Sequence, residues 1–188
     1  MEYKELLAKR RSIRDYLDKK VPLEILQEII KDACYAPSAC NGQPWRFIII
    51  QNKDLIKRIS DENKNYYLDE FKKDPHQFFK KFESLFQNPE YNIFYNASTL
   101  VMICGKRGLS HFWKEDCTLA TAYFMFAATE RQLATCFIGW GAHILNQQLR
   151  KEIGLTEDIE VVAPIIVGYP KTISTTAKRN EPIILKTI

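Results

Sequence analysis

Four groups of residues in this sequence carry side chains that could bind a ligand. The first is the run RRSIR at residues 10–14, in which three guanidinium groups and one hydroxyl fall within five residues. Guanidinium groups match phosphate oxygens in geometry and charge, and a serine hydroxyl adds one more donor. The run therefore indicates either a phosphate site or an exposed basic helix end, whose charge Asp15 would partly offset.

The second group is PSACNGQPW at residues 37–45, between a predicted helix and a predicted strand. Asn41 and Gln43 each present a donor and an acceptor on one planar amide, which suits the polar edge of a heterocycle. A structural turn held by an Asx-type hydrogen bond explains the same residues equally well. Cys40 has no base within motif distance, so we do not assign it as a nucleophile.

The third group is CFIGWG at residues 136–141, and the fourth is the pair Lys178-Arg179 near the C-terminus. Glycine in the third group would let the backbone approach a ligand closely, although a plain turn needs the same residues. The segment is not a dinucleotide fingerprint, because Ile144 stands where GxGxxG needs its third glycine. Taken alone, the basic pair is typical of a solvated surface.

Composition excludes several classes of protein and of site. The 188 residues fit one domain, and the net charge of +4 is too small for a general nucleic-acid binder. Five cysteines without a CxxC pair and three separated histidines make a disulfide framework or a metal site improbable. The most apolar uncharged stretch, residues 117–129, is too short to cross a bilayer. We therefore expect a cytoplasmic protein with reduced thiols, no metal and no membrane partner.

Hydrophobic patterning predicts a sheet covered by helices, without saying whether the sheet is parallel. Pro164 lies inside one predicted strand and favours an edge position or a bulge there. Asn52 is expected to cap a short helix. The expected helices are 2–11, one opened by Val21-Pro22 and stopped by Pro37, the short one after Asn52, 116–133 and 142–153; the expected strands or short apolar segments are 45–51, 98–104, 135–140 and 159–168.

Residues 61–95 hold ten of the 23 aromatic residues of the chain. Phe78, Phe79, Phe82 and Phe86 recur at helical spacing, which favours an amphipathic helix packed on a core. The same aromatic side chains could instead cover a pocket for a flat ligand, with one or two rings involved.

In this order and spacing, the four groups resemble the FMN-dependent nitroreductase family. RRSIR resembles its flavin phosphate motif, and APSACNGQPWRFIII, residues 36–50, resembles its most specific stretch. The segments NASTLVMICGK, DCTLATAYFMFAATERQLATCFIGW and EVVAPIIVGYP resemble its later strand, central helix and strand. The likeness spans nearly the whole chain except residues 61–93. It departs at residues 132–134, where QLA replaces a common Gly-Leu-Gly, and the chain is short for the family.

The resemblance implies a single α+β domain, residues 1–188, with three α-β-α layers and a central mixed, mostly antiparallel sheet. Residues 61–95 would be its variable, aromatic-rich cover region and residues 170–188 its C-terminal extension. It also implies a homodimer with an FMN in each of two clefts at the interface. A partner subunit would then cover the apolar helix at 117–129, and the run 183–186 would add a strand to that partner.

The resemblance further implies which residues contact FMN. Arg14 should lie near the N1–C2=O side of the isoalloxazine ring, and the backbone N–H around Ile138–Gly139 should donate to flavin N5. Asn63 and Asn65 both fit a further contact at the ring edge. The remaining expected contacts are Arg10, Arg11, Ser12, Lys178 and Arg179 for the phosphate, and Pro37, Ser38, Ala39, Asn41 and Gln43 from the second subunit.

The implied activity is an oxidoreductase that passes hydride from NAD(P)H through flavin N5 to a flat electron-poor acceptor such as a nitroaromatic or a quinone. One cleft serving donor and acceptor implies ping-pong kinetics, and the cofactor carries the chemistry without a catalytic side chain. An FMN-binding module without nicotinamide turnover is one alternative. A nucleic-acid contact through RRSIR is another, and strong salt dependence of binding would be its signature.

Overall fold

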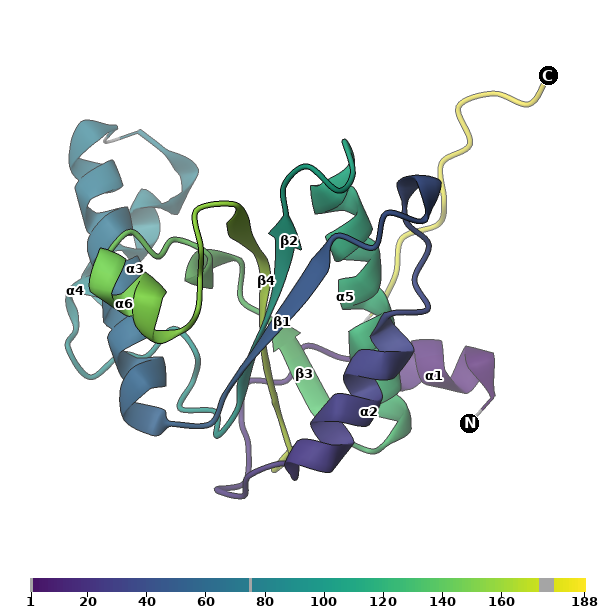
Figure 1. Ribbon diagram of the computed structural model, residues 1–188, viewed down its shortest axis with the longest axis horizontal. Helices are drawn as coiled ribbons and strands as arrows, with labels where there is room; N and C mark the ends of the chain where they lie inside the picture. The colour runs from purple at the N-terminus through teal and green to yellow at the C-terminus, as the bar shows by residue number, and fades with distance from the viewer. Residues whose placement is uncertain (1, 75, 173–177) are drawn as a thin grey trace.

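The computed structural model describes residues 2–74, 76–172 and 178–188. Four strands form one sheet in the order β1-β2-β4-β3, and every pair of neighbours is antiparallel. Among the described residues, the parallel contribution is a single bridge between Ser12 and Thr135. Helices cover both faces, which confirms the predicted three-layer α+β fold (Figure 1). The strands are β1 (Trp45–Ile50), β2 (Leu100–Lys106), β3 (Ala134–Phe137) and β4 (Ile159–Gly168).

The two faces of the sheet carry separate hydrophobic cores. On one face, α3 (Lys53–Lys73), α4 (Glu83–Gln87) and α6 (Gln147–Glu152) pack over a core that includes Phe71 and Phe94. On the other face, α2 (Leu23–Ala33) and α5 (Trp113–Glu130) pack over a core that includes Phe124, and α1 (Tyr3–Lys9) lies outside against α5. None of the helices in the described part of the chain is long and apolar enough to cross a membrane.

Helix α3 begins as predicted and runs much farther than predicted. The side chain of Asn52 accepts a hydrogen bond from the Leu55 backbone N–H at 3.0 Å, which confirms the cap. The helix then continues for 21 residues, because Ile59 and Phe71 extend its buried stripe beyond the expected short segment. Ion pairs between neighbouring turns, such as Lys57 with Asp61, support its solvated face.

The predicted single helix through the phenylalanines of residues 78–86 is wrong. The chain forms a 3-10 turn, η2 (Phe78–Phe82), and then the five-residue α4. Phe86 is buried, whereas Phe78 is 72% exposed, so these rings do not share one buried stripe.

The helix expected over residues 142–153 is shorter than predicted. Helix α6 begins only after Asn146, whose side chain caps it by accepting a hydrogen bond from the Leu149 N–H at 2.9 Å.

Strand β4 contains a bulge beside its proline. Ile103 of β2 pairs with Ala163, and the next residue of β2 pairs with Val161, so Val162 is an extra residue on β4. Because β4 lies between β2 and β3, the edge position expected for Pro164 is wrong and the bulge is confirmed. Pro164 has no N–H to donate, but its carbonyl accepts a hydrogen bond from the Ile138 N–H at 2.8 Å.

Candidate functional site

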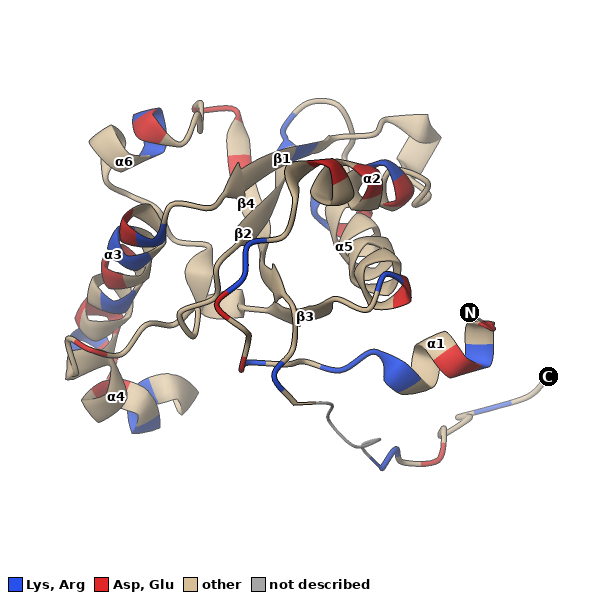
Figure 2. Ribbon diagram, turned by 90° about the horizontal axis from the view of Figure 1, so that it is seen from below, with Lys and Arg blue, Asp and Glu red and all other residues tan. Residues whose placement is uncertain are grey.

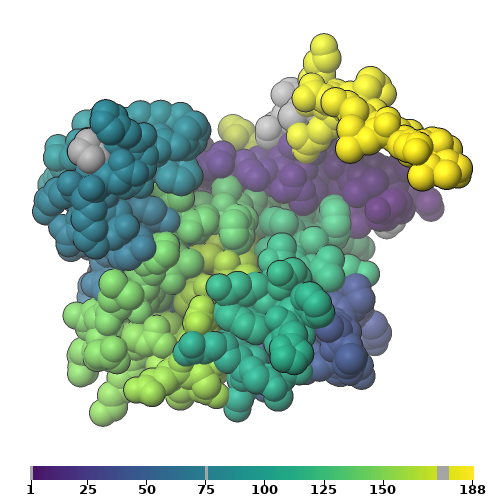
Figure 3. All heavy atoms as spheres, turned by 90° about the horizontal axis from the view of Figure 1, so that it is seen from above, coloured from purple at the N-terminus to yellow at the C-terminus, as the bar shows by residue number. Residues whose placement is uncertain are grey.

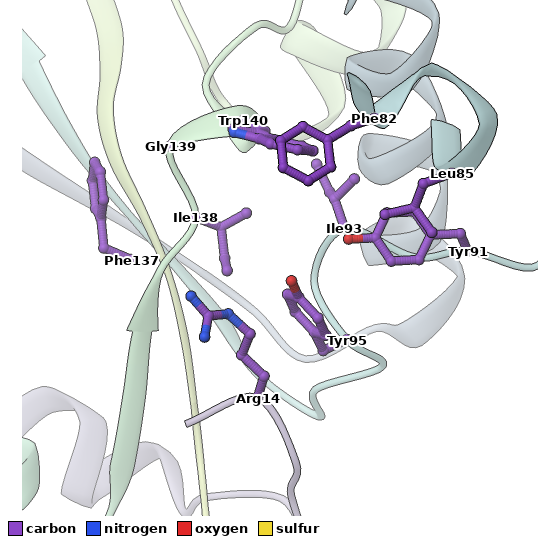
Figure 4. Close-up of a pocket in the computed structure, with 10 residues that line it drawn as sticks. All are labelled: Arg14, Phe82, Leu85, Tyr91, Ile93, Tyr95, Phe137, Ile138, Gly139 and Trp140. Carbon is purple, nitrogen blue, oxygen red and sulfur yellow. The ribbon is translucent and has the colours of Figure 1, made fainter. Parts of the chain in front are cut away.

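A pocket of about 270 Å³ opens where β3 ends, between the N-terminal segment and the cover region. Arg14, which the resemblance placed at the N1–C2=O side of the ring, and Ile138 and Gly139, which it placed at N5, all line this pocket (Figure 4). Aromatic and aliphatic side chains form most of the remaining wall, as expected for a pocket that takes a flat ligand. These further residues are Phe82, Leu85, Tyr91, Ile93, Tyr95, Phe137 and Trp140.

Arg14 reaches the pocket because the segment before it runs along β3. The Ile13 N–H donates to the Thr135 carbonyl at 3.1 Å, beside the bridge between Ser12 and Thr135. The hydroxyl of Tyr16 donates to the Ile13 carbonyl, and Tyr16 is itself buried in the core. These bonds hold the backbone on both sides of Arg14, whose guanidinium faces Ile138 and Gly139 in Figure 4.

The backbone N–H groups of Ile138 and Gly139, at the end of β3, differ in their hydrogen bonds. The Ile138 N–H is already bonded to the Pro164 carbonyl, so Ile138 contributes its side chain to the pocket. Gly139 begins the 3-10 turn η3 (Gly139–Gly141), where a backbone N–H has no partner within the turn. Of these two groups, the Ile138 N–H is used within the fold, whereas the Gly139 N–H makes no backbone hydrogen bond within the described residues.

A cluster of arginines lies beside this pocket wall. Partial burial lowers the pKa of Arg10 below its usual value, and the positive charges of Arg11 and Arg179 lower it further. The basic residues after α1 and in the tail are visible in Figure 2, and Figure 3 shows the tail lying on the N-terminal segment. Positively charged groups gather here although they repel one another, which is typical of a site for an anion.

The same cluster has unused hydrogen-bonding capacity. Within the described part of the chain, no ion pair joins Arg10, Arg11 or Arg179 to a carboxylate, and the nearby Asp15 pairs with Lys171 at 3.1 Å. The buried Nε of Arg11 has no hydrogen-bond partner, and neither has the buried hydroxyl of Thr135 beneath Ser12. Guanidinium donors without an acceptor fit a phosphate group, and Ser12 and Lys178 are exposed beside them.

The loop of residues 38–43 is held in a strained conformation. Cys40, Asn41 and Gln43 have φ angles of 51°, 55° and 44°, in the left-handed region that non-glycine residues avoid. The loop is fixed from outside, because the Ala39 N–H donates to the buried carboxylate of Asp116 at 3.0 Å. Strain of this kind persists where the surrounding structure imposes it, often at binding sites. The amides of Asn41 and Gln43 are exposed, as a contact with a ligand requires.

This loop lies at the opposite corner of the sheet from the arginine cluster. Trp45, directly after the loop, is level with Glu160 of β4, whereas Ser12 is level with Val167. The two positions are about 23 Å apart along β4 at about 3.3 Å per residue. They also lie at the two edges of the sheet, on β1 and β3. Within one chain, the structure therefore does not bring Pro37, Ser38, Ala39, Asn41 and Gln43 to the pocket.

The two asparagines considered for the ring edge differ in accessibility. Asn63 is fully buried: its amide nitrogen donates to the Ile59 carbonyl at 2.8 Å, and its oxygen accepts from the His143 N–H at 2.8 Å. Both ends of the Asn63 amide are thus used within the fold, and Asn63 cannot contact a ligand. Asn65 is exposed but does not line the pocket.

Sequence patterns did not single out several pocket residues, Tyr91 and Tyr95 above all. The aromatic richness of residues 61–95 was the only signal, and it did not distinguish these two from the rings that pack in the core. As for metals, no group of three or more His, Cys, Asp or Glu side chains in the described ranges could hold one.

The chain matches one family model and several known proteins over most of its length. The nitroreductase family model matches residues 7–169. A proposed NADH dehydrogenase/NAD(P)H nitroreductase of Archaeoglobus fulgidus is 28% identical over 172 residues, covering 89% of this chain and 84% of that protein. An iodotyrosine deiodinase of Thermotoga neapolitana is 23% identical over 183 residues, covering 96% and 95%.

The fold is shared with solved structures as well. A nitroreductase from Bacteroides fragilis, crystallised with bound FMN, superposes with a TM-score of 0.81 at 22% identity, covering 100% of this chain and 98% of that one. At this level of identity the match establishes the fold. Because the family model spans most of the chain, the protein belongs to the nitroreductase family.

Proposed function

We propose that this protein is an FMN-dependent oxidoreductase that passes hydride from NAD(P)H to a flat electron-poor acceptor. The observation that supports this most is the pocket that joins Arg14 with Gly139 beside an arginine cluster free of carboxylates in the described residues. Family membership and FMN in the related Bacteroides fragilis structure support the same cofactor. The five free cysteines fit the reducing cytoplasm that we propose as its compartment.

The residues of this chain bind and orient the cofactor in the proposal. Arg10, Arg11 and Ser12, with Lys178 and Arg179, hold its phosphate. Bound FMN supplies the atom, N5, that accepts and returns hydride. The Gly139 N–H donates at that edge of the ring, and the guanidinium of Arg14 stabilises the negative charge of the reduced ring at N1–C2=O. No side chain needs to act as acid or base, so we assign no catalytic residue.

Donor and acceptor occupy the same pocket in turn, which gives ping-pong kinetics. The pocket wall of Phe82, Leu85, Tyr91 and Trp140 suits flat conjugated acceptors such as nitroaromatics and quinones.

A second copy of the chain completes each site in the proposal. Its loop supplies Pro37, Ser38, Ala39, Asn41 and Gln43, since one chain holds this loop and its own arginine cluster at opposite corners of the sheet. Helix α5 exposes Leu119 and Tyr123 on its outer side, where a partner would pack. The apolar side chains of residues 183–185 are largely exposed, as expected of a tail that adds a strand to a partner.

The test is to purify the protein and measure its flavin. We expect a yellow preparation with one FMN per chain, bleached by NADH or NADPH without oxygen and restored by a nitroaromatic or a quinone. A colourless protein that takes up no FMN would sink the proposal. FMN that neither nicotinamide bleaches would instead favour a binding module without turnover.

A second candidate reaction is the reductive removal of iodine from an iodotyrosine. The full-length similarity to the Thermotoga neapolitana deiodinase supports including it. The acceptor series should therefore contain 3-iodotyrosine, with released iodide measured alongside flavin reoxidation. Iodide release that outpaces reduction of nitroaromatics and quinones would favour the deiodinase over the general reductase.

A further inference from the structure

Residues 88–97 form a loop, here called the tyrosine loop, that brings Tyr91 and Tyr95 to the pocket wall. Two side chains of α3 hold it from below. The ammonium group of Lys64 donates to the carbonyls of Asn88 and Tyr91 at 3.1 and 2.9 Å. The hydroxyl of Ser60 accepts from the Ile93 N–H at 3.0 Å. Because Lys64 and Ser60 are buried, the loop is a built part of the fold.

The backbone at the end of this loop is strained. Tyr95 and Asn96 have φ angles of 53° and 52°, and neither is a glycine. Their neighbours Phe94 and Ala97 are buried in the core, so packing on both sides imposes the conformation. Two successive left-handed residues are costly, and such strain is often found where a side chain must be aimed at a ligand. Here the strained backbone projects the Tyr95 side chain into the pocket (Figure 4).

Tyr91 and Tyr95 lie edge to face in the pocket wall, with their ring centroids 6.2 Å apart. Burial raises the pKa of Tyr91 above its usual value, and the neighbouring Tyr95 raises it further. A protonated phenol can donate a hydrogen bond to a ligand. In Figure 4 both hydroxyls point toward the space enclosed by the lining residues.

Tyr95 also shares its part of the pocket with Arg14. The guanidinium carbon of Arg14 lies 5.7 Å from the centre of the Tyr95 ring. Arg14 and Tyr95 therefore line the same part of the pocket. Gly139, which we place at N5, lies on a different segment of the pocket wall.

We propose that Tyr95 donates a hydrogen bond to the C2 carbonyl oxygen of the bound isoalloxazine, on the side that Arg14 serves. This inference rests on the proposed function. Negative charge on the reduced ring is shared between N1 and this oxygen, and hydrogen bonds to charged groups are stronger than those to neutral ones. Tyr95 therefore favours the reduced ring over the oxidised one.

The test compares Tyr95→Phe and Tyr91→Phe with the wild type, using Tyr169→Phe as the matched control. Each change removes one hydroxyl and keeps the ring, and Tyr169 lies outside the pocket. The measurements are the two-electron reduction potential of bound FMN under anaerobic conditions and the affinity of the apoprotein for FMN and for 2-thio-FMN. The sulfur of 2-thio-FMN replaces the C2 oxygen and is a weaker hydrogen-bond acceptor.

In Tyr95→Phe, we expect the preference for reduced over oxidised FMN to fall about tenfold, which lowers the two-electron potential by about 30 mV. Tyr91→Phe should show a smaller decrease, because it is Tyr95 whose ring packs against Arg14, and Tyr169→Phe should show none. The loss of affinity caused by Tyr95→Phe should be smaller for 2-thio-FMN than for FMN.

The outcomes separate this inference from the function on which it rests. A wild-type protein that binds no FMN overturns both. FMN binding with an unchanged potential in Tyr95→Phe overturns the inference alone. If that variant changes only the KM of the electron acceptor, Tyr95 faces the substrate and the assignment to the C2 oxygen is wrong.

Discussion

Replacing Lys64 by methionine tests whether the tyrosine loop depends on α3. The Lys64 side chain is 5% exposed, and its ammonium group contacts two loop carbonyls and the carboxylate of Asp61, at 2.9 Å. Methionine has a similar length and lacks the charge and the donors. The substitution therefore removes these contacts without opening a large cavity.

The expected loss of stability depends on whether each group bonded to Lys64 keeps another partner in Lys64→Met. Asp61 is 41% exposed and keeps Lys57 at 2.6 Å, so no buried charge is left unpaired. The Asn88 carbonyl keeps the Tyr91 N–H at 3.2 Å, whereas no other donor is recorded for the Tyr91 carbonyl among the described residues. Leaving one buried acceptor unsatisfied costs about 1–3 kcal/mol. We expect a loss of about 2 kcal/mol, or about 4–8 °C in Tm for a chain of this size.

Chemical denaturation of the protein without FMN measures this loss directly. Lys53→Met is the matched control, because Lys53 pairs with Asp18 at 2.6 Å with side chains 55% and 81% exposed. An exposed pair contributes only about 0.2–1 kcal/mol. Hydrogen exchange should also locate the effect, with faster exchange at the Ile93 N–H that Ser60 holds.

Equal stability of Lys64→Met and Lys53→Met would refute this reasoning. It would mean that the cost of burying the Lys64 ammonium group cancels its hydrogen bonds. A stability loss without faster exchange in the tyrosine loop would place the role of Lys64 elsewhere in α3.

Four further predictions follow from described contacts. Arg179→Ala should lower the affinity for FMN at least tenfold and leave that for riboflavin, which has no phosphate, unchanged in parallel titrations. Arg14→Ala should still bind FMN but with a lower reduction potential by potentiometry; an unchanged potential would mean that Arg14 does not face N1. Gly141→Ala should cost about 1–3 kcal/mol in denaturant titrations, because its Cβ would lie 2.6 Å from the Phe94 ring, and a neutral result would show that the ring moves aside. Burial lowers the pKa of His143, so as the pH falls below about 6.5 the unfolded state binds a proton before the folded state does, and the folded state loses stability. The free energy of unfolding should therefore fall less between pH 7.5 and pH 5 in His143→Gln than in the wild type. An equal fall in the two proteins would contradict this reasoning.

Local sequence patterns were sufficient to predict the strands and the positions of most helices. β1, β2 and β4 are continuous apolar runs with many β-branched residues, and their bounds lie within two residues of those expected. Patterns could not choose between the two interpretations of Pro164, because the bulge is defined by pairing with a distant strand. The helix predicted from the spacing of the phenylalanines in residues 78–86 was wrong for a similar reason. Contacts with Trp140 and Phe71, far away in the sequence, decide which rings are buried.

The candidate site was predictable in part. Arg14, Ile138 and Gly139 were singled out from separate motifs, and the structure brings them to one pocket. Their proximity arises because the N-terminal segment runs along β3, which no local pattern reveals. Tyr95 could not be found in this way, since nothing in its neighbourhood predicts a left-handed backbone at an aromatic residue.

The bulge in β4 determines where the protein can change length. Before Val162, Ile159 and Val161 face the core beneath α3; after it, Ala163 and Ile165 face the core beneath α5. An uninterrupted pleat would keep all four on one face. Losing Val162 would restore a regular pleat and leave these four side chains in their present cores. Losing Val161 would give the same chain, because both residues are valine, whereas losing a residue elsewhere inside β4 would turn part of the strand to the other face. One extra residue thus lets a single strand serve both cores, and the pair Val161-Val162 is where β4 can lose a residue while the other side chains stay in their present cores.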